Sequence, residues 1–355
     1  MVSSFPHQYV DRASGRIVTE KMIGDRAVAF LYNTLRENSP TLFRALTSAR
    51  MSSLLAFCHY DRPGGHHSRA EDVFSRLGID WQECLQPPSY YSTMRRIFER
   101  QIRYWDLRPM DEDPAVIVSP ADARLLIGSF AESSALFIKE KFFDIEELLG
   151  CNSPWHTHFH GGDFSVCRLT PDKYHYNHLP VSGRVEAIYE VDGCYHSCNP
   201  LAFIAVASLY SKNRRVVTVI DTDVEGGSRV GLVAMVEIVA LMIGDIIQAY
   251  SEVGYVDPQP VVSGLMVRKG CPKSLYRPGS STDVLLFQAG RIQFDADLVA
   301  NSRRHDVSSR FTSNSGRPLV ETDIRLRSSL ARRRKKQAGQ LESEPPPIKR
   351  TPKSN

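Results

Sequence analysis

Short apolar runs separated by turn residues dominate the chain after residue 115, and this pattern constrains the fold more than any other feature. Each run is bounded by Pro, Gly, Asp or Asn, which is typical of strands, and is too short to form a helix. Before residue 104, apolar residues recur instead at spacings of three and four, which predicts helices. We therefore predict an α+β protein, with a helical region at residues 1–105 on a β-rich domain at residues 106–302. The apolar runs are 116–118, 125–127, 135–138, 185–189, 216–220, 232–236 and 284–287.

The last part of the chain differs in composition from the rest. After Ser302 it is rich in Ser and Arg, and a Pro-rich and basic segment follows. Such a composition cannot bury enough apolar surface to offset its ordering entropy, so we expect residues 303–355 to form a disordered basic tail. Residues 331–355 hold eight Lys and Arg against two Glu, a net charge of +6 in a chain of +4, so the rest of the chain carries −2. The tail could stay solvated or bind nucleic acid or an anionic surface, with nucleic acid the less favoured partner.

Cysteine usage and hydropathy indicate where the chain works. The seven Cys residues include no Cys-x-x-Cys pair, so we expect free thiols in a reducing compartment and no structural zinc. The first residues lack the basic and apolar regions of a secretory signal. The apolar stretch Val230–Tyr250 contains Glu237 and Asp245, which predicts buried strand and helix and no membrane span. We expect a cytoplasmic protein that could contact a membrane peripherally, although we interpret the amphipathic stretch Tyr91–Tyr104 first as a helix packed on the body.

Three segments carry residue types suited to nucleophilic catalysis. They are Val118–Ala123 with Asp122 in a Pro-bounded turn, Leu169–Pro180 with His175 and His178, and Gly279–Thr282 with Ser280 and Ser281. From residue types alone, Ser281 as nucleophile, His178 as base and Asp122 as the orienting residue could form a triad. Three such residues can be picked from almost any chain, and an Asp in a turn commonly only caps it, so this pattern alone does not establish a site.

Three alternating histidines, His156, His158 and His160, follow Trp155. On a strand they would share one face and could bind a metal. No Asp, Glu or Cys completes an obvious site, so we expect exposed imidazoles in a loop and no metal centre.

Taken together and in order, these segments resemble the phosphatidylserine decarboxylase family. The family pattern includes Val-x-Pro-Ala-Asp-Gly, then Leu-x-Pro-x-Asp-Tyr-His-Arg-x-His-x-Pro-x-x-Gly, then Gly-Ser-Thr-x-x-x-Leu-Phe. The similarity spans about residues 90–298, leaves out the basic tail, and is looser from residue 8 into the helical region. The matching segments are Phe98–Arg100, Arg108–Pro109, Val118–Ala123, Leu148–Gly150, Leu169–Gly183, Asn199–Pro200, Asn213–Arg215 and Ser280–Phe287.

The resemblance implies a chain that makes its own pyruvoyl cofactor by cleaving the bond between Ser280 and Ser281. In the family, the serine that becomes the pyruvoyl group lies six residues before a Phe, and counting back from Phe287 selects Ser281. No separate cofactor would be needed. The two fragments, residues 1–280 and 281–355, would stay associated.

The same resemblance assigns roles to three further residues. His178 matches the base that activates the serine, and Asp122 matches the residue that orients this base. His175 matches the histidine implicated in substrate handling and decarboxylation. The chain departs from the pattern at Ala123, which replaces a Gly that could have used a positive φ. It departs again at Ser280, which replaces a Gly, and between the two histidines.

These departures leave the substrate open. The leading function implied by the resemblance is a carboxy-lyase that converts phosphatidylserine to phosphatidylethanolamine and CO₂. An alternative within the same chemistry is a soluble decarboxylase of free aromatic amino acids such as tryptophan, because similar proteins of that kind share a Gly-Ser-Ser sequence. An alternative of another class is a non-catalytic relative that binds nucleic acid or an anionic surface through its basic tail. Loss of Asp122, His178 or Ser281 would have favoured that alternative, and all three are present.

Overall fold

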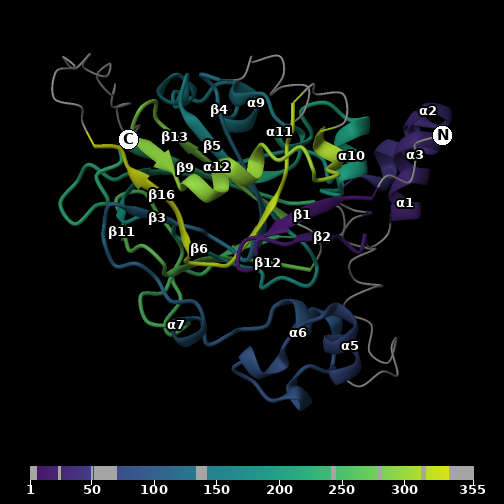
Figure 1. Cartoon of the computed structure of the whole chain (residues 1–355), viewed down its shortest axis with the longest axis horizontal. Helices are drawn as coiled ribbons and strands as arrows, with labels where there is room; N and C mark the ends of the chain where they lie inside the picture. The colour runs from purple at the N-terminus through teal and green to yellow at the C-terminus, as the bar shows by residue number, and fades with distance from the viewer. Residues whose placement is uncertain are drawn as a thin grey trace, which may run out of the picture.

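A ten-stranded sheet forms the centre of the molecule (Figure 1). The computed structural model describes residues 6–22, 25–48, 51, 70–132, 142–240, 245–278, 281–312 and 317–335. Neighbouring strands of this sheet run antiparallel except for one parallel pair, the strands that begin at Gln8 and Thr322. The strand order is β11 (Met266–Val267), β7 (Gly183–Val191), β8 (Arg215–Asp221), β9 (Leu232–Ile238), β13 (Ser281–Phe287), β5 (Asp163–Leu169), β4 (Ala123–Ser129), β15 (Thr322–Ile324), β1 (Gln8–Asp11) and β2 (Ile17–Thr19).

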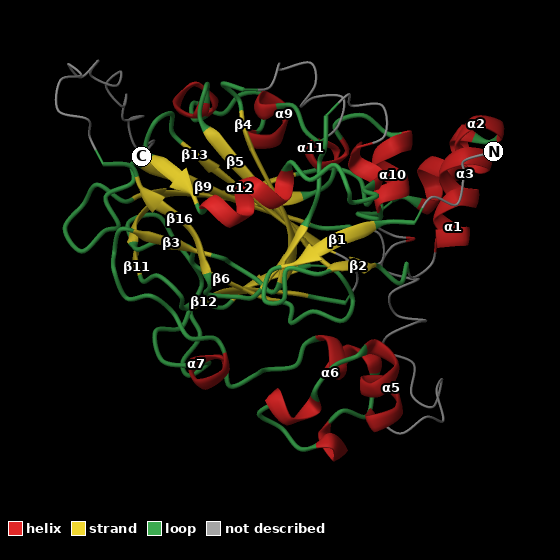
Figure 2. Cartoon of the chain, in the orientation of Figure 1, coloured by secondary structure: helices red, strands yellow, loops and turns green. Residues whose placement is uncertain are grey.

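Two three-stranded sheets pack on one face of the central sheet. Figure 2 shows them on the side of the central sheet that lies away from the helices α9 (Ile145–Leu149) and α11 (Leu209–Lys212). Their buried apolar residues join one core cluster with Leu285 and Phe287 of β13. The first sheet is β10 (Ile246–Gln248), β12 (Pro272–Tyr276) and β6 (Tyr176–His178), and the second is β14 (Ile292–Phe294), β16 (Ser329–Arg333) and β3 (Val116–Val118).

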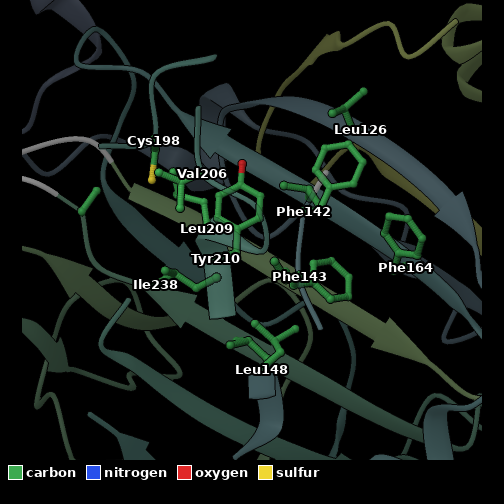
Figure 3. Packing of buried hydrophobic residues seen from close by; sticks show 14 of the residues in the cluster. Leu126, Phe142, Phe143, Leu148, Phe164, Cys198, Val206, Leu209, Tyr210 and Ile238 are labelled. Atoms are coloured by element: carbon green, nitrogen blue, oxygen red, sulfur yellow. The ribbon is translucent and has the colours of Figure 1, made fainter. Parts of the chain in front are cut away.

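Helices cover the opposite face of the central sheet. Because side chains alternate along a strand, Val284 and Leu286 point to this side of β13. The helices that pack here include α9 (Ile145–Leu149), α10 (Pro200–Ala205) and α11 (Leu209–Lys212). Figure 3 shows this packing, in which residues of the helical layer meet Leu126 and Phe164 of the sheet. The labelled residues of the helical layer are Phe142, Phe143, Leu148, Leu209 and Tyr210.

The remaining helices are short. Those near the N-terminus are α1 (Asp25–Ala29), the π-helical turn Phe30–Leu35, α2 (Arg36–Asn38) and α3 (Pro40–Leu46). Those that lie apart from the sheets in Figure 1 are α5 (Ala70–Leu77) and α6 (Met94–Phe98), with α7 (Tyr104–Leu107) following them. The other elements are the 3₁₀ turns Trp81–Glu83, Pro88–Tyr90, His156–Phe159 and Arg310–Thr312, and α12 (Ala296–Ser302).

The structure explains two of the motifs that match the family pattern. In Asn199–Pro200, the Asn199 side chain caps α10 by accepting a hydrogen bond from the Leu201 N–H, and Pro200 occupies the first turn. In the motif that ends at Gly183, a Cβ atom on this glycine would lie 2.4 Å from the carbonyl oxygen of Asp221. The close approach of β7 to β8 therefore requires glycine.

The prediction of an α+β protein is confirmed, but two details of the expected helical region are wrong. Residues 8–19 form β1 and β2, because Tyr9 and Val10 are buried in the central sheet beside β15, more than 300 residues away in sequence. A contact so distant in sequence leaves no local signal. The stretch Tyr91–Tyr104 is not one amphipathic helix, since α6 ends at Phe98 and Ile102 forms an extended bridge with Cys84.

The expected start of the disordered tail is also wrong. Residues 322–333 form β15 and β16, and Val320, Ile324, Leu326 and Leu330 are buried. Ile324 and Leu330 belong to strands of two different sheets, a placement that local composition does not reveal. Residues 336–355, with the rest of the predicted tail, lie outside the described residues.

The apolar stretch around Glu237 contributes the buried strand β9 and the half-buried strand β10. In the part of the chain that the structure describes, no helix has the length and apolar character needed to cross a bilayer.

Candidate active site

The turn that carries Asp122 lies directly beside β6. The backbone N–H of His178 donates to the carbonyl of Pro120 at 2.8 Å, and the N–H of Val118 donates to the carbonyl of Pro180 at 3.1 Å. These bonds bring together two segments that the sequence singled out separately. Ala123 begins β4 and is absent from the residues with positive φ, so its Cβ causes no strain there.

Asp122 is a buried carboxylate held by an arginine. Arg108 donates two hydrogen bonds to it, at 3.0 and 2.8 Å, and the N–H of Leu326 adds a third at 2.7 Å. Burial alone would raise the pKa of Asp122, but the hydrogen bonds and charge of Arg108 outweigh it and lower the pKa. Asp122 is therefore ionised at neutral pH. It forms no hydrogen bond with His178 among the described residues, although its charge acts on that imidazole.

His178 is a neutral imidazole with a defined tautomer. Its Nδ1 lies 2.8 Å from the carbonyl oxygen of Gly270, which can only accept, so Nδ1 carries the proton. Its Nε2 therefore has a free lone pair and accepts from the hydroxyl of Tyr174 at 3.1 Å. Tyr104 packs edge-on against the ring, with centroids 4.6 Å apart. Burial lowers the pKa of His178 to about 3, which keeps Nε2 available as a base.

His175 has an unpartnered nitrogen. Its Nδ1 donates to the carbonyl of Lys173 at 2.7 Å, while its Nε2 is buried without a hydrogen-bond partner among the described residues. The ring of Phe98 lies 3.6 Å from the imidazole, centroid to centroid. Burial, and next the nearby charge of Arg100, lower the pKa of His175 to about 3. The matched motif Phe98–Arg100 thus surrounds this histidine, a role that the sequence pattern did not reveal.

Ser281 is the first residue of β13. It is fully buried opposite Leu169 of β5, and its Oγ has no hydrogen-bond partner among the described residues. A buried polar atom without a partner is a candidate for chemistry or for bound water, and Ser281 Oγ shares this property with other side-chain atoms of the described residues. Ser280 and Gly279 lie outside the described residues, so the structure does not describe the predicted scissile bond.

The two histidines face different sides of β6. Asn177 donates to Glu237 of β9, so its side chain points toward the central sheet. His175 lies just before β6, but its carbonyl accepts a hydrogen bond from the Tyr276 N–H, so the pairing with β12 extends to this residue. Strand alternation therefore places its side chain on the same side as Asn177. His178 lies on the other side with Tyr174. The structure thus brings Asp122 next to His178, and it places His175 on the opposite side of β6, with Phe98 against its ring.

A cavity of about 680 Å³ opens beside His178. Two of its lining residues, Tyr104 and Gly270, are also the contacts of the His178 ring. Arg268 and Arg327 contribute positive charge to the wall, and Glu112 and Glu252 contribute negative charge. The imidazole therefore lies directly behind a wall of a cavity large enough for a small ligand.

The alternating histidines do not lie on a strand. His156 and His158 belong to a 3₁₀ turn, and His156 Nδ1 bonds the carbonyl of Ser153 at 2.7 Å. A different group, His7, Glu20 and Glu321, has its ligand atoms within 4.8 Å of one another. Arg168 already lies between its carboxylates, at 2.6 Å from Glu20 and 2.7 Å from Glu321, so a guanidinium takes the place that a cation would need.

We expect Arg168→Met to lower the free energy of unfolding by about 3–5 kcal/mol, because it leaves two glutamates in a buried site without their cation. The matched control is Arg184→Met, which removes an exposed ion pair with Glu186 and should cost about 0–1 kcal/mol. Urea unfolding of the two variants measures the difference. Equal losses would show that the Arg168 network is no more important than a surface pair.

The two low imidazole pKa values predict a pH dependence of stability. Between about pH 6.5 and 3 the unfolded chain binds a proton on His175 and on His178 that the folded chain does not bind. Stability should therefore fall as the pH falls, by about 1.4 kcal/mol per pH unit for each imidazole. Urea unfolding at pH 6 and pH 5 measures this slope. The double variant His175→Gln, His178→Gln should lose that part of it, and an unchanged slope would contradict buried neutral rings.

A family model described as phosphatidylserine decarboxylase matches residues 94–313. The phosphatidylserine decarboxylase proenzyme of Chlamydia trachomatis serovar L2 is 30% identical over 331 residues, which cover 92% of this chain and 97% of the relative. A proenzyme of the same name from Fusobacterium nucleatum subsp. nucleatum is 28% identical over 300 residues, or 83% and 92% of the two chains. Phosphatidylserine decarboxylase proenzyme 2 of Oryza sativa subsp. japonica is 34% identical over 238 residues, or 64% of this chain and 34% of the relative. The chain therefore belongs to the phosphatidylserine decarboxylase family.

Proposed function

We propose that the chain is a self-cleaving carboxy-lyase that converts phosphatidylserine to phosphatidylethanolamine and CO₂ with a pyruvoyl group derived from Ser281. The observation that carries this proposal is the similarity along 92% of the chain to a protein named as a phosphatidylserine decarboxylase proenzyme. The word proenzyme denotes a precursor that must be processed. The family pattern selects Ser281 for that processing, and its buried, unpartnered hydroxyl is suited to it.

The surroundings of Ser281 fit a pyruvoyl group. Conversion removes the hydroxyl, and Ser281 Oγ has no hydrogen bond that this change would break. β13 is buried along its length and is paired with β5 on one side and β9 on the other. These two ladders would hold the new chain end in place after cleavage. The pyruvoyl group supplies a carbonyl that accepts electrons as CO₂ leaves the substrate.

The cleavage chemistry uses only the chain and one water molecule. Ser281 Oγ loses its proton to a base and attacks the carbonyl carbon of Ser280, and the peptide C–N bond breaks to leave an ester. Loss of the α-proton of residue 281 then breaks the ester C–O bond, which frees the carboxylate of Ser280 and leaves dehydroalanine. Water adds to this residue and ammonia departs, which completes the pyruvoyl group.

Four residues carry the proposed roles. His178 is the base for Ser281, since its Nε2 is unprotonated, and Asp122 supplies the nearby negative charge that favours proton uptake by this ring. His175 handles the proton of the decarboxylation step, for which its free Nε2 is suited. Arg108 positions Asp122 through two hydrogen bonds.

The cavity beside His178 suits a substrate that arrives from a membrane surface. Exposed apolar side chains stand on its wall, with Trp105 46%, Val253 73% and Val256 62% exposed. Trp favours the boundary between lipid and water. Arg268 and Arg327 offer charged donors to a phosphate. We assign peripheral lipid contact to this surface.

Release of CO₂ from carboxyl-labelled substrates tests the function. Vesicles that contain phosphatidylserine should yield labelled CO₂ and phosphatidylethanolamine, while free serine and free tryptophan should not. Release from free tryptophan without release from the vesicles would replace the lipid substrate with an aromatic amino acid. A cleaved chain that acts on neither would refute the decarboxylase itself.

A further inference from the structure

A cluster of charged side chains is buried on the face of β13 that carries Ser281. Glu237, Lys273 and Asp283 have no exposed surface. Lys273 Nζ donates to Glu237 at 2.6 Å and to Gln248 at 2.9 Å. In the ladder between β9 and β13, Glu237 lies directly opposite Asp283. Two acids and one base therefore share a space without water access.

The hydrogen bonds of Tyr276 indicate which acid is neutral. The Tyr276 hydroxyl accepts from the Ile238 N–H at 3.1 Å and lies 2.9 Å from the Thr282 carbonyl oxygen and 2.7 Å from Asp283 Oδ1. A phenol has one hydrogen, and a carbonyl oxygen can only accept, so Tyr276 donates its hydrogen to the Thr282 carbonyl. The short contact to Asp283 then needs a hydrogen from Asp283. Its other oxygen, Oδ2, has no partner among the described residues, which costs much less for a neutral acid than for a carboxylate.

The charges of the cluster agree with this assignment. Ionised Glu237 and protonated Lys273 neutralise each other, so an ionised Asp283 would leave one uncompensated buried charge. Burial, and next the charge of Glu237, raise the pKa of Asp283 well above its usual value. Asp283 pairs with Cys167 of β5 across the ladder, and burial raises the pKa of the Cys167 thiol. Asn177, Ser274 and Gln248, all uncharged, also join the hydrogen-bond network of the cluster.

The cluster contains residues from both sides of the proposed cleavage point in the sequence. Tyr276 lies on β12, before residue 280, and its partners Thr282 and Asp283 lie on β13, after it. Asp283 is two residues from Ser281, on the same face of the strand. A cut between residues 280 and 281 leaves these bonds intact, and they join the two fragments next to the new chain end.

We propose that Asp283 is held as a neutral carboxylic acid and acts with Tyr276 as a positioning clamp, which fixes the first residues of β13 during and after cleavage. The inference rests on the proposed cleavage at residues 280 and 281, and it concerns residues that the resemblance leaves without a role. Asp283 does not react. It donates to Tyr276, which in turn keeps its own hydrogen on the Thr282 carbonyl.

Two substitutions at one position separate a neutral donor from a carboxylate. In Asp283→Asn the amide N–H replaces the acid as donor to Tyr276, so cleavage should stay within about twofold of the wild-type rate. In Asp283→Leu the shape is kept but the donor is lost, and cleavage should slow about tenfold, as the loss of one buried hydrogen bond implies. Tyr276→Phe removes this bond together with the Tyr276 bonds to Thr282 and Ile238, so cleavage should slow at least as much as in Asp283→Leu. It serves as the test if the Leu variant fails to fold by circular dichroism.

A second measurement does not depend on cleavage. The infrared spectrum of the folded wild-type chain at neutral pH should contain the C=O stretch of a protonated carboxylic acid, and this band should be missing from Asp283→Asn. If no such band is lost, or if Asp283→Asn is as slow as Asp283→Leu, Asp283 works as a carboxylate and the clamp is refuted. A wild-type chain that is never cleaved would refute the proposed function instead, and the infrared band would still decide the state of Asp283.

Discussion

Ser281→Ala should give a single uncut chain with no decarboxylase activity. Alanine has no Oγ to attack the carbonyl of Ser280, so neither the ester nor the pyruvoyl group can form. The loss should be complete, since no other group substitutes for the cofactor precursor. The variant should fold normally because Ser281 Oγ makes no hydrogen bond with the described residues.

The neighbouring serine provides the matched control. Ser280→Ala keeps the backbone carbonyl that is attacked and removes only a side chain that the proposed chemistry does not use. This variant should therefore be cleaved and active. Denaturing gels and CO₂ release measure both changes. Cleavage of the Ser281→Ala chain, or loss of cleavage only in Ser280→Ala, would move the reactive residue away from Ser281.

His178→Ala should slow self-cleavage by about 100-fold or more, whereas His175→Ala should be cleaved and then fail to decarboxylate. A positioned base commonly contributes at least this factor. His178 has an unprotonated Nε2 next to the charge of Asp122, and His175 has an Nε2 without a hydrogen-bond partner among the described residues. Timed denaturing gels follow cleavage, and CO₂ release from the purified cut chain follows decarboxylation.

The opposite result would exchange the two roles. If His175→Ala stays uncut while His178→Ala matures normally, His175 is the base for Ser281, against the family pattern. Asp122→Asn separates the cases further. It should slow cleavage together with His178→Ala if Asp122 acts through His178, and it should leave cleavage unchanged if His175 is the base.

The sequence predicted the strands of the catalytic region better than the segments that complete them. Runs such as 232–236 and 284–287 became β9 and β13, because a central strand buried on both faces needs a continuous apolar run. β1 and β15 escaped prediction because their burial depends on each other, across more than 300 residues of chain. The helix predicted over Tyr91–Tyr104 was too long, since α6 ends at Phe98 and Ile102 pairs with Cys84 in an extended bridge.

The sequence predicted which residues belong to the candidate site, but not how they are arranged in space. Spacing and resemblance selected Asp122, His175, His178 and Ser281, but the two sides of β6 follow only from its pairing with β12. The buried cluster had one visible signal, a glutamate inside the most apolar stretch. Glu237 needed a partner, and neither Lys273 nor Asp283 could be identified as one without the register of β9, β12 and β13.

The intact mass of the denatured wild-type protein tests the proposed self-cleavage most directly. Two species are expected, residues 1–280 and residues 281–355, and the second should lack an N-terminal amine and resist Edman degradation. A pyruvoyl group in place of serine would also appear as a lower mass of that fragment. A single uncut chain that nevertheless releases CO₂ from phosphatidylserine, or a second fragment that begins with an ordinary serine, would contradict the mechanism.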